Sequence, residues 1–371
     1  MIEHFRKQIE DVDSKFVGLD KVDFMLPVYN PKTHYITVAE SKYFQALVRL
    51  RHFIKGASDV YWGQLHGAYN IDLFMMTPSV SSPMGSGSDS EAIPIKFGNL
   101  RTYLTDSSQF GFEPILVNGI SRAYCYLPSM RGEYPDKRHL NQFYHCEAEV
   151  VGSLDQLKPL IQGYVGFLAE TLLSMKNILY LLSIDYDVTI QKLNSLTDVT
   201  QYTEILLEDV VKILMDNGLS DCVYKTAHGK DVSNTGEIRV AEILKIKCPF
   251  WITNYDRDRV AFYQRPCREN PNKVINADLI FPRIIDISFG GEIIGAGERQ
   301  DNKDDIYESL RRQGLDSKPY EWYINLRGLK DYHTTSGFGL GVERFIAWAL
   351  NMDDIKNTIL YPRLKNIMTY P

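Results

Sequence analysis

The pattern of apolar and polar positions predicts helices in several parts of the chain. Residues 38–66 place apolar side chains at helical spacing, which predicts one long amphipathic helix. Residues 154–183 predict a second long helix, and residues 199–217 predict a third that ends at Gly218, where glycine commonly terminates a helix. Before them, residues 1–30 predict a short charged helix followed by an irregular segment.

Alternating segments rich in Ile, Phe and Tyr predict the strands of a sheet. The run QFYHCEAEVV at 142–151 alternates as a half-buried strand does. Residues 337–351 begin with glycines and continue as the helical run FIAWAL. No internal repeat and no parallel strand–helix–strand rhythm is present, so the pattern predicts an α+β fold with an antiparallel sheet flanked by helices. The other strands are expected at 71–76, 101–105 and 122–129, and within 249–264 and 274–299.

One segment between these elements is unusually rich in Ser and Gly. It is SVSSPMGSGSDSEA at residues 79–92. A surface loop explains this composition. A mobile lid over a site also explains it, because lids need small hinge residues.

Composition narrows the class of protein. The 371 residues are 44% hydrophobic and 24% charged, as in a soluble globular protein. The net charge of −6 argues against a broad basic face for nucleic acid, although a local basic channel is compatible with it. The five cysteines have no C-x-x-C spacing, and neither a signal peptide nor an apolar run of about 20 residues is present. We therefore expect a cytoplasmic protein without a zinc site, a disulfide framework or a membrane span.

The first group of residues with chemical potential lies on two predicted strands and the polar loop between them. Arg131 comes before the loop EYPDKRHLN, which begins at Glu133, and Phe143, Glu147 and Glu149 come after it. Arginine offers a planar fork for phosphate oxygens, and an aromatic ring offers a stacking face for a base. Such strands can hold a nucleotide at both ends, whereas a surface ion pair explains the charges without any ligand.

The second group is the run SGFGLGVER from Ser336 to Arg344. Alternating glycines let a backbone approach a ligand closely, and the following helix offers free N–H groups. The spacing differs from that of the dinucleotide-binding fingerprint. A glycine-rich strand packed against a helix explains the same residues without a ligand.

The third group is the run DISFGGEIIGAGER from Asp286 to Arg299. Asp286 and Glu292 share a face if the strand is regular, and such a pair can hold Mg²⁺ with water and phosphates completing the shell. Arg299 can meet a substrate carboxylate or amide. A hairpin with solvated acids is the alternative explanation.

Taken together and in this order, these runs resemble the motifs of class II aminoacyl-tRNA synthetases, in particular the asparaginyl and aspartyl subgroup. RGEYPDKRHLNQFYHCEAEV is similar to motif 2 of that subgroup, and GFGLGVERFIAWALNMDDIKNTILYPR is similar to motif 3. YLTDSSQFGFE is similar to its amino-acid-binding strand, and WYINLR precedes motif 3 as in asparaginyl enzymes. The resemblance covers about residues 40–371. It implies the class II synthetase fold and ATP-dependent activation of an amino-acid carboxylate as an adenylate.

The resemblance also implies a role for each residue of an ATP site. Arg131 would bind the α-phosphate and the reacting carboxylate, and Glu133 would recognise the adenine amino group. Phe143 would stack on adenine, with Arg344 packed on the other side and touching the γ-phosphate. Arg131 and Arg344 are thus the expected catalytic residues. The other expected ATP ligands are Arg138, His139, Glu292 and Gly341.

For the metal, the resemblance implies that Glu292 holds Mg²⁺, with Glu147 nearby. The aspartate that assists it in the family matches Asp286 by its spacing to Glu292, or Asp278 by its context ADLIFP. We expect Asp286 to be the one.

For the amino acid, the resemblance implies that Ser107 and Gln109 hold its ammonium or carboxylate group and that Arg299 grips its side chain. Gln142 and Gly337 complete the expected pocket. The sequence departs from the family here, because Gln142 replaces an acid and Phe112 replaces the lysine that aspartyl enzymes place near the substrate carboxylate. We therefore expect a substrate resembling asparagine or aspartate, with a modest preference between them.

Two further departures concern the ends of the catalytic region. We expect residues 1–35 to form an N-terminal extension and residues 36–371 to form the catalytic domain, which leaves no room for the family's anticodon-binding barrel in this chain. Thr335 stands where the family has a histidine before motif 3.

Three functions are compatible with these observations. The favoured one is an enzyme that makes an aminoacyl-adenylate and passes it to a small nucleophile, as stand-alone asparagine synthetases of this type do or as an amide-forming ligase would. The second is an asparaginyl-tRNA ligase, and the third is a non-catalytic paralogue that senses an amino acid or tRNA. The intact ATP set counts against the third, so the expected ligands are ATP, Mg²⁺ and an amino acid, with tRNA left open. A homodimer is expected through residues 45–78.

Overall fold

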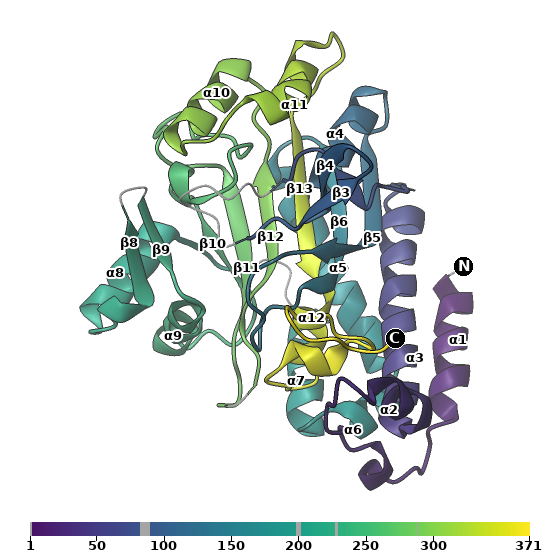
Figure 1. Ribbon diagram of the computed structural model, residues 1–371. Helices are drawn as coiled ribbons and strands as arrows, with labels where there is room; N and C mark the ends of the chain where they lie inside the picture. The colour runs from purple at the N-terminus through teal and green to yellow at the C-terminus, as the bar shows by residue number, and fades with distance from the viewer. Residues whose placement is uncertain (1, 82–89, 198–201, 227–228, 287) are drawn as a thin grey trace.

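An eight-stranded, largely antiparallel sheet forms the centre of the molecule. The protein is described by a computed structural model that covers residues 2–81, 90–197, 202–226, 229–286 and 288–371. The sheet has the order β1-β5-β6-β13-β12-β11-β10-β7 (Figure 1), and only its two edge pairs, β1 with β5 and β7 with β10, are parallel. The α+β prediction is confirmed. The strands are β1 Tyr69–Asn70, β5 Arg122–Met130, β6 Gln142–Val151, β7 Glu204–Leu206, β10 Phe250–Thr253, β11 Asn276–Phe281, β12 Gly291–Glu298 and β13 Thr335–Gly341.

Helices cover one face of this sheet and bury the main hydrophobic core against it. On β6 the side chains of Cys146, Ala148 and Val150 point into this core, which excludes water from that whole face. The longest covering helix, α5, packs beside α3 and α7. The helices that contribute to this core are α1 Ile2–Ser14, α3 Lys42–Ser58, α5 Leu154–Leu173, α6 Lys176–Leu182, α7 Tyr186–Thr197 and α12 Val342–Ala349.

Smaller units flank the sheet at its two ends. Helices α8 Leu207–Asp216 and α9 Asn234–Leu244 pack with the hairpin of β8 Val223–Thr226 and β9 Gly229–Val232 around a second core. Helices α10 Lys303–Arg312 and α11 Glu321–Asn325 lie together at another corner (Figure 1). A three-stranded sheet of β2 Met76–Thr77, β4 Leu100–Leu104 and β3 Pro94–Phe97 lies beside α4 Gln109–Val117 in the same view.

The two longest predicted helices are each broken in the structure. The segment 38–66 divides at Ser41, which separates α2 His34–Glu40 from α3. The Ser41 hydroxyl accepts a hydrogen bond from the Tyr43 N–H and so caps the start of α3. A π-helical segment, Asp59–Leu65, follows α3. The segment 154–183 bends by 88° between α5 and α6. The Asp13 carboxylate from α1 accepts the Ile178 N–H at the start of α6, which is a tertiary cap that the local pattern does not reveal.

Other predicted boundaries also change. The strand expected at 71–76 is wrong, because only its last residue is extended, in β2, and β1 ends before it. The segment 199–217 contains a short strand, β7, before α8, while its residues 199–201 lie outside the described part. Only the first residues of 249–264 form a strand, β10. The Ser- and Gly-rich segment at 79–92 falls mostly outside the described residues, so neither explanation of it is tested.

Among the described residues, no single helix is both long and apolar enough to cross a membrane, and only the bent pair α5–α6 meets the length and composition criteria jointly.

Candidate active site

The strand alternation of β6 gives the sheet a polar face opposite the main core. Phe143, His145, Glu147 and Glu149 point to this polar face, because successive strand side chains alternate. On the neighbouring strand β13 the same face carries glycines. A Cβ placed on Gly337 would lie 1.8 Å from Glu149 Oε2, so glycine is required for the Glu149 side chain to cross that strand. The β6 side chains and the glycines of β13 form the floor of an open site.

A pocket with about 580 Å³ of empty space, part of it open to solvent, occupies one end of this floor. Its walls come from the loop before β6, from β12 and β13, and from the start of α12. The structure brings together in it all of the residues expected to bind ATP, namely Arg131, Glu133, Arg138, His139, Phe143, Glu292, Gly341 and Arg344.

Arg131 and Phe143 form the aromatic and cationic wall of the pocket. The Arg131 guanidinium lies 5.3 Å from the centre of the Phe143 ring, and its Nε atom is buried without a hydrogen-bond partner. A buried donor without a partner is costly unless a ligand accepts from it. His145 also lines the pocket, and burial, helped by Arg131 and Arg344, lowers its pKa well below the usual range, so the ring is neutral at pH 7.

Arg344 and Arg138 face each other across Glu292. Arg344 Nη1 donates to Glu292 Oε2 at 2.9 Å, and Arg138 donates to the backbone carbonyls of Gly290 and Glu292. Burial opposes ionisation of Glu292, but the charges of Arg344 and Arg138 outweigh it and lower the pKa of this carboxyl group. Burial and the like charge of Arg344 lower the pKa of Arg138 to about 10. Two guanidinium groups that donate to the same residue favour the binding of a polyanion beside them.

Of the two aspartates considered for the metal, the structure places Asp278, and not the preferred Asp286, near Glu292. Asp278 on β11 pairs in register with Gly295, and a Cβ on Gly295 would lie 3.4 Å from Asp278 Oδ1 and 3.3 Å from Glu292 Oε1. Asp286 is exposed in the turn after β11. The structure therefore does not support the choice of Asp286, because Asp286 lies in a turn and β12 begins only at Gly291. The carboxylate that approaches Glu292, across the β11–β12 hairpin, is that of Asp278.

An irregularity in β12 explains why Glu292 reaches this face. The register of β11 with β12 shifts between Leu279 and Ile280, which leaves one extra residue in β12 after Glu292. Such a bulge re-aims a side chain. Two carboxylates on one side of a pocket fit a Mg²⁺ ion that keeps water and phosphate oxygens as its other ligands. Among the described residues no group of three or more His, Cys, Asp or Glu side chains suited to a metal is present.

The other end of the floor is built around Arg299. Its Nε and Nη2 atoms donate to the two oxygens of Glu149, each at 2.9 Å, and the Thr335 hydroxyl donates to Glu149 Oε1 at 2.7 Å. Arg299 is 3% exposed and Glu149 is 1% exposed. Burial disfavours the charge of Arg299, but the Glu149 carboxylate offsets this and raises the pKa of Arg299. The expected lone arginine is thus half of a buried ion pair.

Ser107 and Gln109 lie at the start of a helix, α4, rather than on a strand as predicted. Gln109 Oε1 accepts from Arg299 Nη2, whereas Gln109 Nε2 is buried without a partner and is free to donate to a ligand. Ser107 donates to the Glu147 carboxylate, which also accepts the Ser108 N–H at 2.8 Å. Glu147 therefore holds the start of α4 in place.

Two residues expected near the amino acid lie elsewhere. Gln142 points to the opposite face of β6, into a groove with Arg51 and Arg363, because it differs from Phe143 by one strand position. Phe112 is 1% exposed and packs with Leu116 in a separate hydrophobic cluster.

The aromatic ring that contacts the Arg299 guanidinium is that of Tyr263, whose centre lies 5.3 Å away. Glu149 and His145 received no role in the site from the sequence, although strict alternation from Phe143 along β6 places both on the site face.

Comparison with known proteins agrees with this fold and site. Residues 35–365 match the family model described as tRNA synthetases class II (D, K and N). The chain belongs to this family, which confirms the resemblance based on the motifs.

Within that family, the chain is similar to asparagine–tRNA ligases. It is 29% identical to the enzyme of Thermococcus gammatolerans over 272 residues, which are 72% of this chain and 59% of that protein. It is 27% identical to the enzyme of Thermoplasma acidophilum over 331 residues, which are 87% of this chain and 70% of that protein. The chain thus matches less than two thirds of the length of the Thermococcus relative.

The structure of asparaginyl-tRNA synthetase from Pyrococcus horikoshii complexed with asparaginyl-adenylate superposes with a TM-score of 0.79 and 24% identity. The match covers 94% of this chain and 76% of that one. At this identity the likeness establishes the shared fold.

Proposed function

We propose that this protein uses ATP to activate asparagine as asparaginyl-adenylate and passes the asparaginyl group to tRNA. The observation that carries the proposal is the pairing, on one sheet face, of a cationic nucleotide pocket with a buried and electrically neutral Arg299–Glu149 pair. The similarity to asparagine–tRNA ligases supports the same conclusion.

At the nucleotide end, the chemistry is the attack of a carboxylate oxygen on the α-phosphorus of ATP, with pyrophosphate leaving. Both reactants are anions, so their repulsion is the main barrier that the protein has to lower. Arg131, with its unpartnered Nε, is placed to hold the α-phosphate and the carboxylate together, and Arg344 is placed to hold the leaving phosphates. A carboxylate is already a nucleophile, so no general base is needed.

Mg²⁺ held by Glu292 and Asp278 would neutralise phosphate charge when bound. The glutamate is prepared for this role by its neighbours. Arg344 and Arg138 keep the Glu292 carboxyl group ionised, as the lowered pKa indicates. Arg344 also fixes its orientation through the 2.9 Å ion pair.

At the amino-acid end, the Arg299–Glu149 pair favours an amide over a carboxylate. An amide can accept a hydrogen bond from the guanidinium and donate one to the remaining lone pair of Glu149 Oε2. The carboxylate of aspartate can accept but cannot donate, and it would place a second negative charge beside a buried Glu149. The modest preference expected from a lone arginine is replaced by a clear preference for asparagine.

This selection also bears on the acceptor. The sequence argument favoured transfer to a small nucleophile, as in asparagine synthetases, which activate aspartate. The neutral pair counts against aspartate, and the relatives are tRNA ligases, so tRNA is the better-supported acceptor.

The test is pyrophosphate exchange into ATP, measured for each amino acid in turn, followed by charging of purified tRNA with labelled asparagine. We expect exchange with asparagine and asparaginyl-tRNA as product. Exchange with aspartate and formation of free asparagine from ammonia would contradict the proposal.

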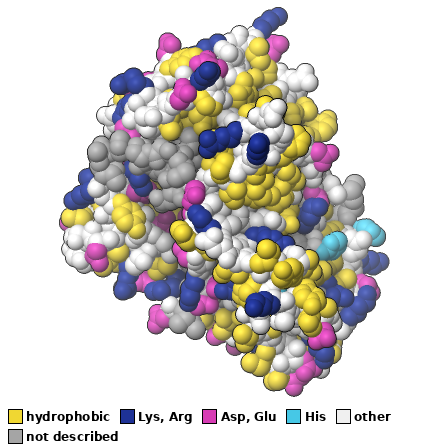
Figure 2. All heavy atoms as spheres, viewed as in Figure 1, with side chains coloured by type: hydrophobic (Ala, Val, Ile, Leu, Met, Phe, Trp, Pro, Cys, Tyr) yellow, Lys and Arg dark blue, Asp and Glu magenta, His cyan; other side chains and the backbone are white. Residues whose placement is uncertain are grey.

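We also propose a homodimer. Figure 2 shows hydrophobic side chains gathered over β3 and β4, where Phe97 and Leu100 are 60% and 67% exposed. The adjoining residues Phe74, Met75 and Met76 are exposed as well. Apolar surface of this kind commonly marks an interface. A monomer mass in light scattering that does not change with concentration would contradict it.

A further inference from the structure

A second buried ion pair lies behind the amino-acid end of the site. Arg327 Nη2 and Glu113 Oε2 are 2.8 Å apart, and their side chains are 1% and 0% exposed. The pair is enclosed by two tyrosines. The Tyr323 hydroxyl donates to Glu113 Oε1, and the Tyr332 hydroxyl lies 3.1 Å from Glu113 Oε2.

This pair connects two elements that carry pocket residues. Glu113 is on α4, four positions after Gln109 and therefore on the same side of the helix. On the other side, Arg327 Nε donates at 2.9 Å to the carbonyl of Gln300, the residue after Arg299. One guanidinium thus fixes the distance between α4 and the end of β12, and Gln109 and Arg299 project from these two elements towards each other.

The arrangement demands an arginine. Arg327 donates to Gln300 and Glu113 and also to the carbonyl and hydroxyl oxygens of Tyr323, at 2.9 and 2.8 Å. A lysine ammonium is a single point and cannot span these acceptors, whereas the guanidinium reaches all of them with fixed geometry. None of these atoms contacts the nucleotide pocket.

We propose that Arg327 and Glu113 are positioning residues that set the spacing between Gln109 and Arg299 and thereby the fit of the asparagine amide. The inference rests on the proposed function for its substrate. A small displacement of pocket groups can cost up to about a hundredfold in efficiency. The loss falls on the amino acid, because the nucleotide end is built from other elements.

The test compares Arg327→Lys and the milder Tyr332→Phe with the wild type in pyrophosphate exchange. We expect KM for asparagine to rise about tenfold or more in Arg327→Lys and by a smaller factor in Tyr332→Phe, while KM for ATP stays within about twofold. Hydrogen exchange of the α4 amides should accelerate in both variants. If Arg327→Lys fails to fold, the Tyr332→Phe result decides.

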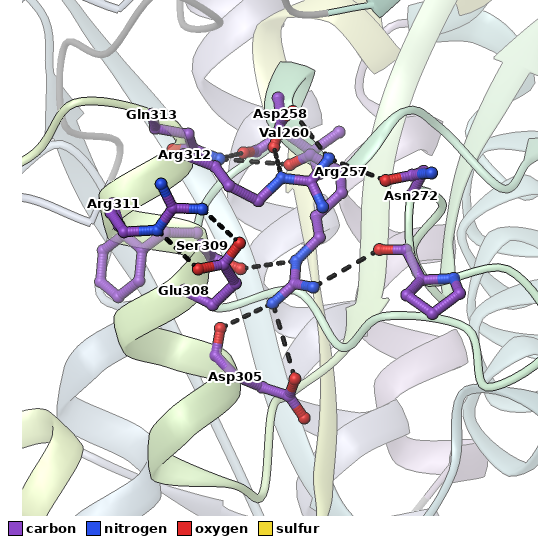
Figure 3. A network of polar contacts seen from close by, with 12 residues as sticks. Arg257, Asp258, Val260, Asn272, Asp305, Glu308, Ser309, Arg311, Arg312 and Gln313 are labelled. Atoms are coloured by element: carbon purple, nitrogen blue, oxygen red, sulfur yellow. Dashed lines mark hydrogen bonds and ion pairs between the residues drawn. The ribbon is translucent and has the colours of Figure 1, made fainter.

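The matched control is Arg257→Lys. Arg257 is also a buried arginine with several acceptors, donating to Ser309 Oγ and to the carbonyls of Asp305 and Pro271, and it holds α10 (Figure 3). None of these bonds is to Gln109, Arg299 or Glu149. The Ser309 hydroxyl also accepts from the Gln300 side chain, whereas Arg327 holds the Gln300 carbonyl, so the control tests loss of the side-chain contact alone. The Arg257→Lys variant should have a lower melting temperature than the wild type and an unchanged KM for asparagine.

The outcomes separate this inference from the proposed function. A rise in KM for asparagine alone, absent in Arg257→Lys, supports the positioning role. Equal changes in both KM values, an unchanged KM for asparagine, or the same effect in Arg257→Lys overturns it. If the wild type shows no exchange with asparagine, the proposed function fails, and hydrogen exchange then decides the inference: acceleration limited to α4 and residues 299–300 supports it, and uniform acceleration overturns it.

Discussion

Replacing Glu149 with glutamine should shift the proposed preference for asparagine towards aspartate. The substitution keeps the shape of the side chain and removes its charge, so the buried Arg299, held at 2.9 Å by both Glu149 oxygens, becomes an uncompensated cation. Opposite unit charges 4 Å apart are worth about 4 kcal/mol at an effective dielectric constant of 20. A carboxylate substrate can take up part of this attraction in place of Glu149.

We expect the ratio of kcat/KM for asparagine over aspartate to fall at least tenfold, which corresponds to about 1.4 kcal/mol. Stability should also fall, because removing one partner of a buried pair typically costs about 3–5 kcal/mol and a glutamine oxygen recovers only part of it. The assay is pyrophosphate exchange with each amino acid, together with thermal unfolding.

The matched control is Glu298→Gln. Glu298 is 6% exposed and forms an ion pair with Arg265 at 2.8 Å. Glu298 precedes Arg299 in the sequence but faces the other side of β12, where it accepts a hydrogen bond from the Leu154 N–H. It should lower stability without changing the ratio. An unchanged ratio in folded Glu149→Gln, or the same change in Glu298→Gln, would refute the electrostatic argument.

Three further predictions concern other groups. Arg131→Ala and Arg344→Ala should each cost about 2–4 kcal/mol of transition-state stabilisation, and exchange within a few-fold of wild type would contradict their roles. Asp278→Asn should raise the Mg²⁺ concentration needed for half-maximal exchange, whereas Asp286→Asn should leave it unchanged. An effect of Asp286→Asn alone would show that Asp286 is the metal ligand, as its spacing to Glu292 predicted. Burial lowers the pKa of Lys192 to about 7 in the folded protein, whereas an unfolded lysine has a pKa of about 10. Between pH 7 and pH 10 only the unfolded chain carries the proton on this lysine, so the folded state becomes more stable as the pH rises. Lys192→Met should therefore be more stable than wild type at pH 7. A difference of about three pKa units corresponds to a gain of up to about 4 kcal/mol in the free energy of unfolding. This difference between the two proteins should narrow towards pH 10, and a difference that does not change with pH would contradict the prediction.

The sequence by itself determined the class of fold and most of the nucleotide pocket. Arg131, Phe143 and Arg344 belong to runs whose residue order is specific to one family, and local alternation places Phe143 on the correct face of β6. The same alternation already contained the information that Gln142 faces away and Glu149 faces in.

Tertiary structure alone decided what depends on contacts between distant segments. Asp278 and Glu292 meet because a turn and a β-bulge, neither visible in residue spacing, bring two strands of a hairpin into register. Arg299 is neutralised by Glu149, a residue 150 positions away in the sequence, which no local pattern reports. The charge of a pocket is a sum over side chains from several strands, so the argument for an amide substrate can be made only when those strands are assembled.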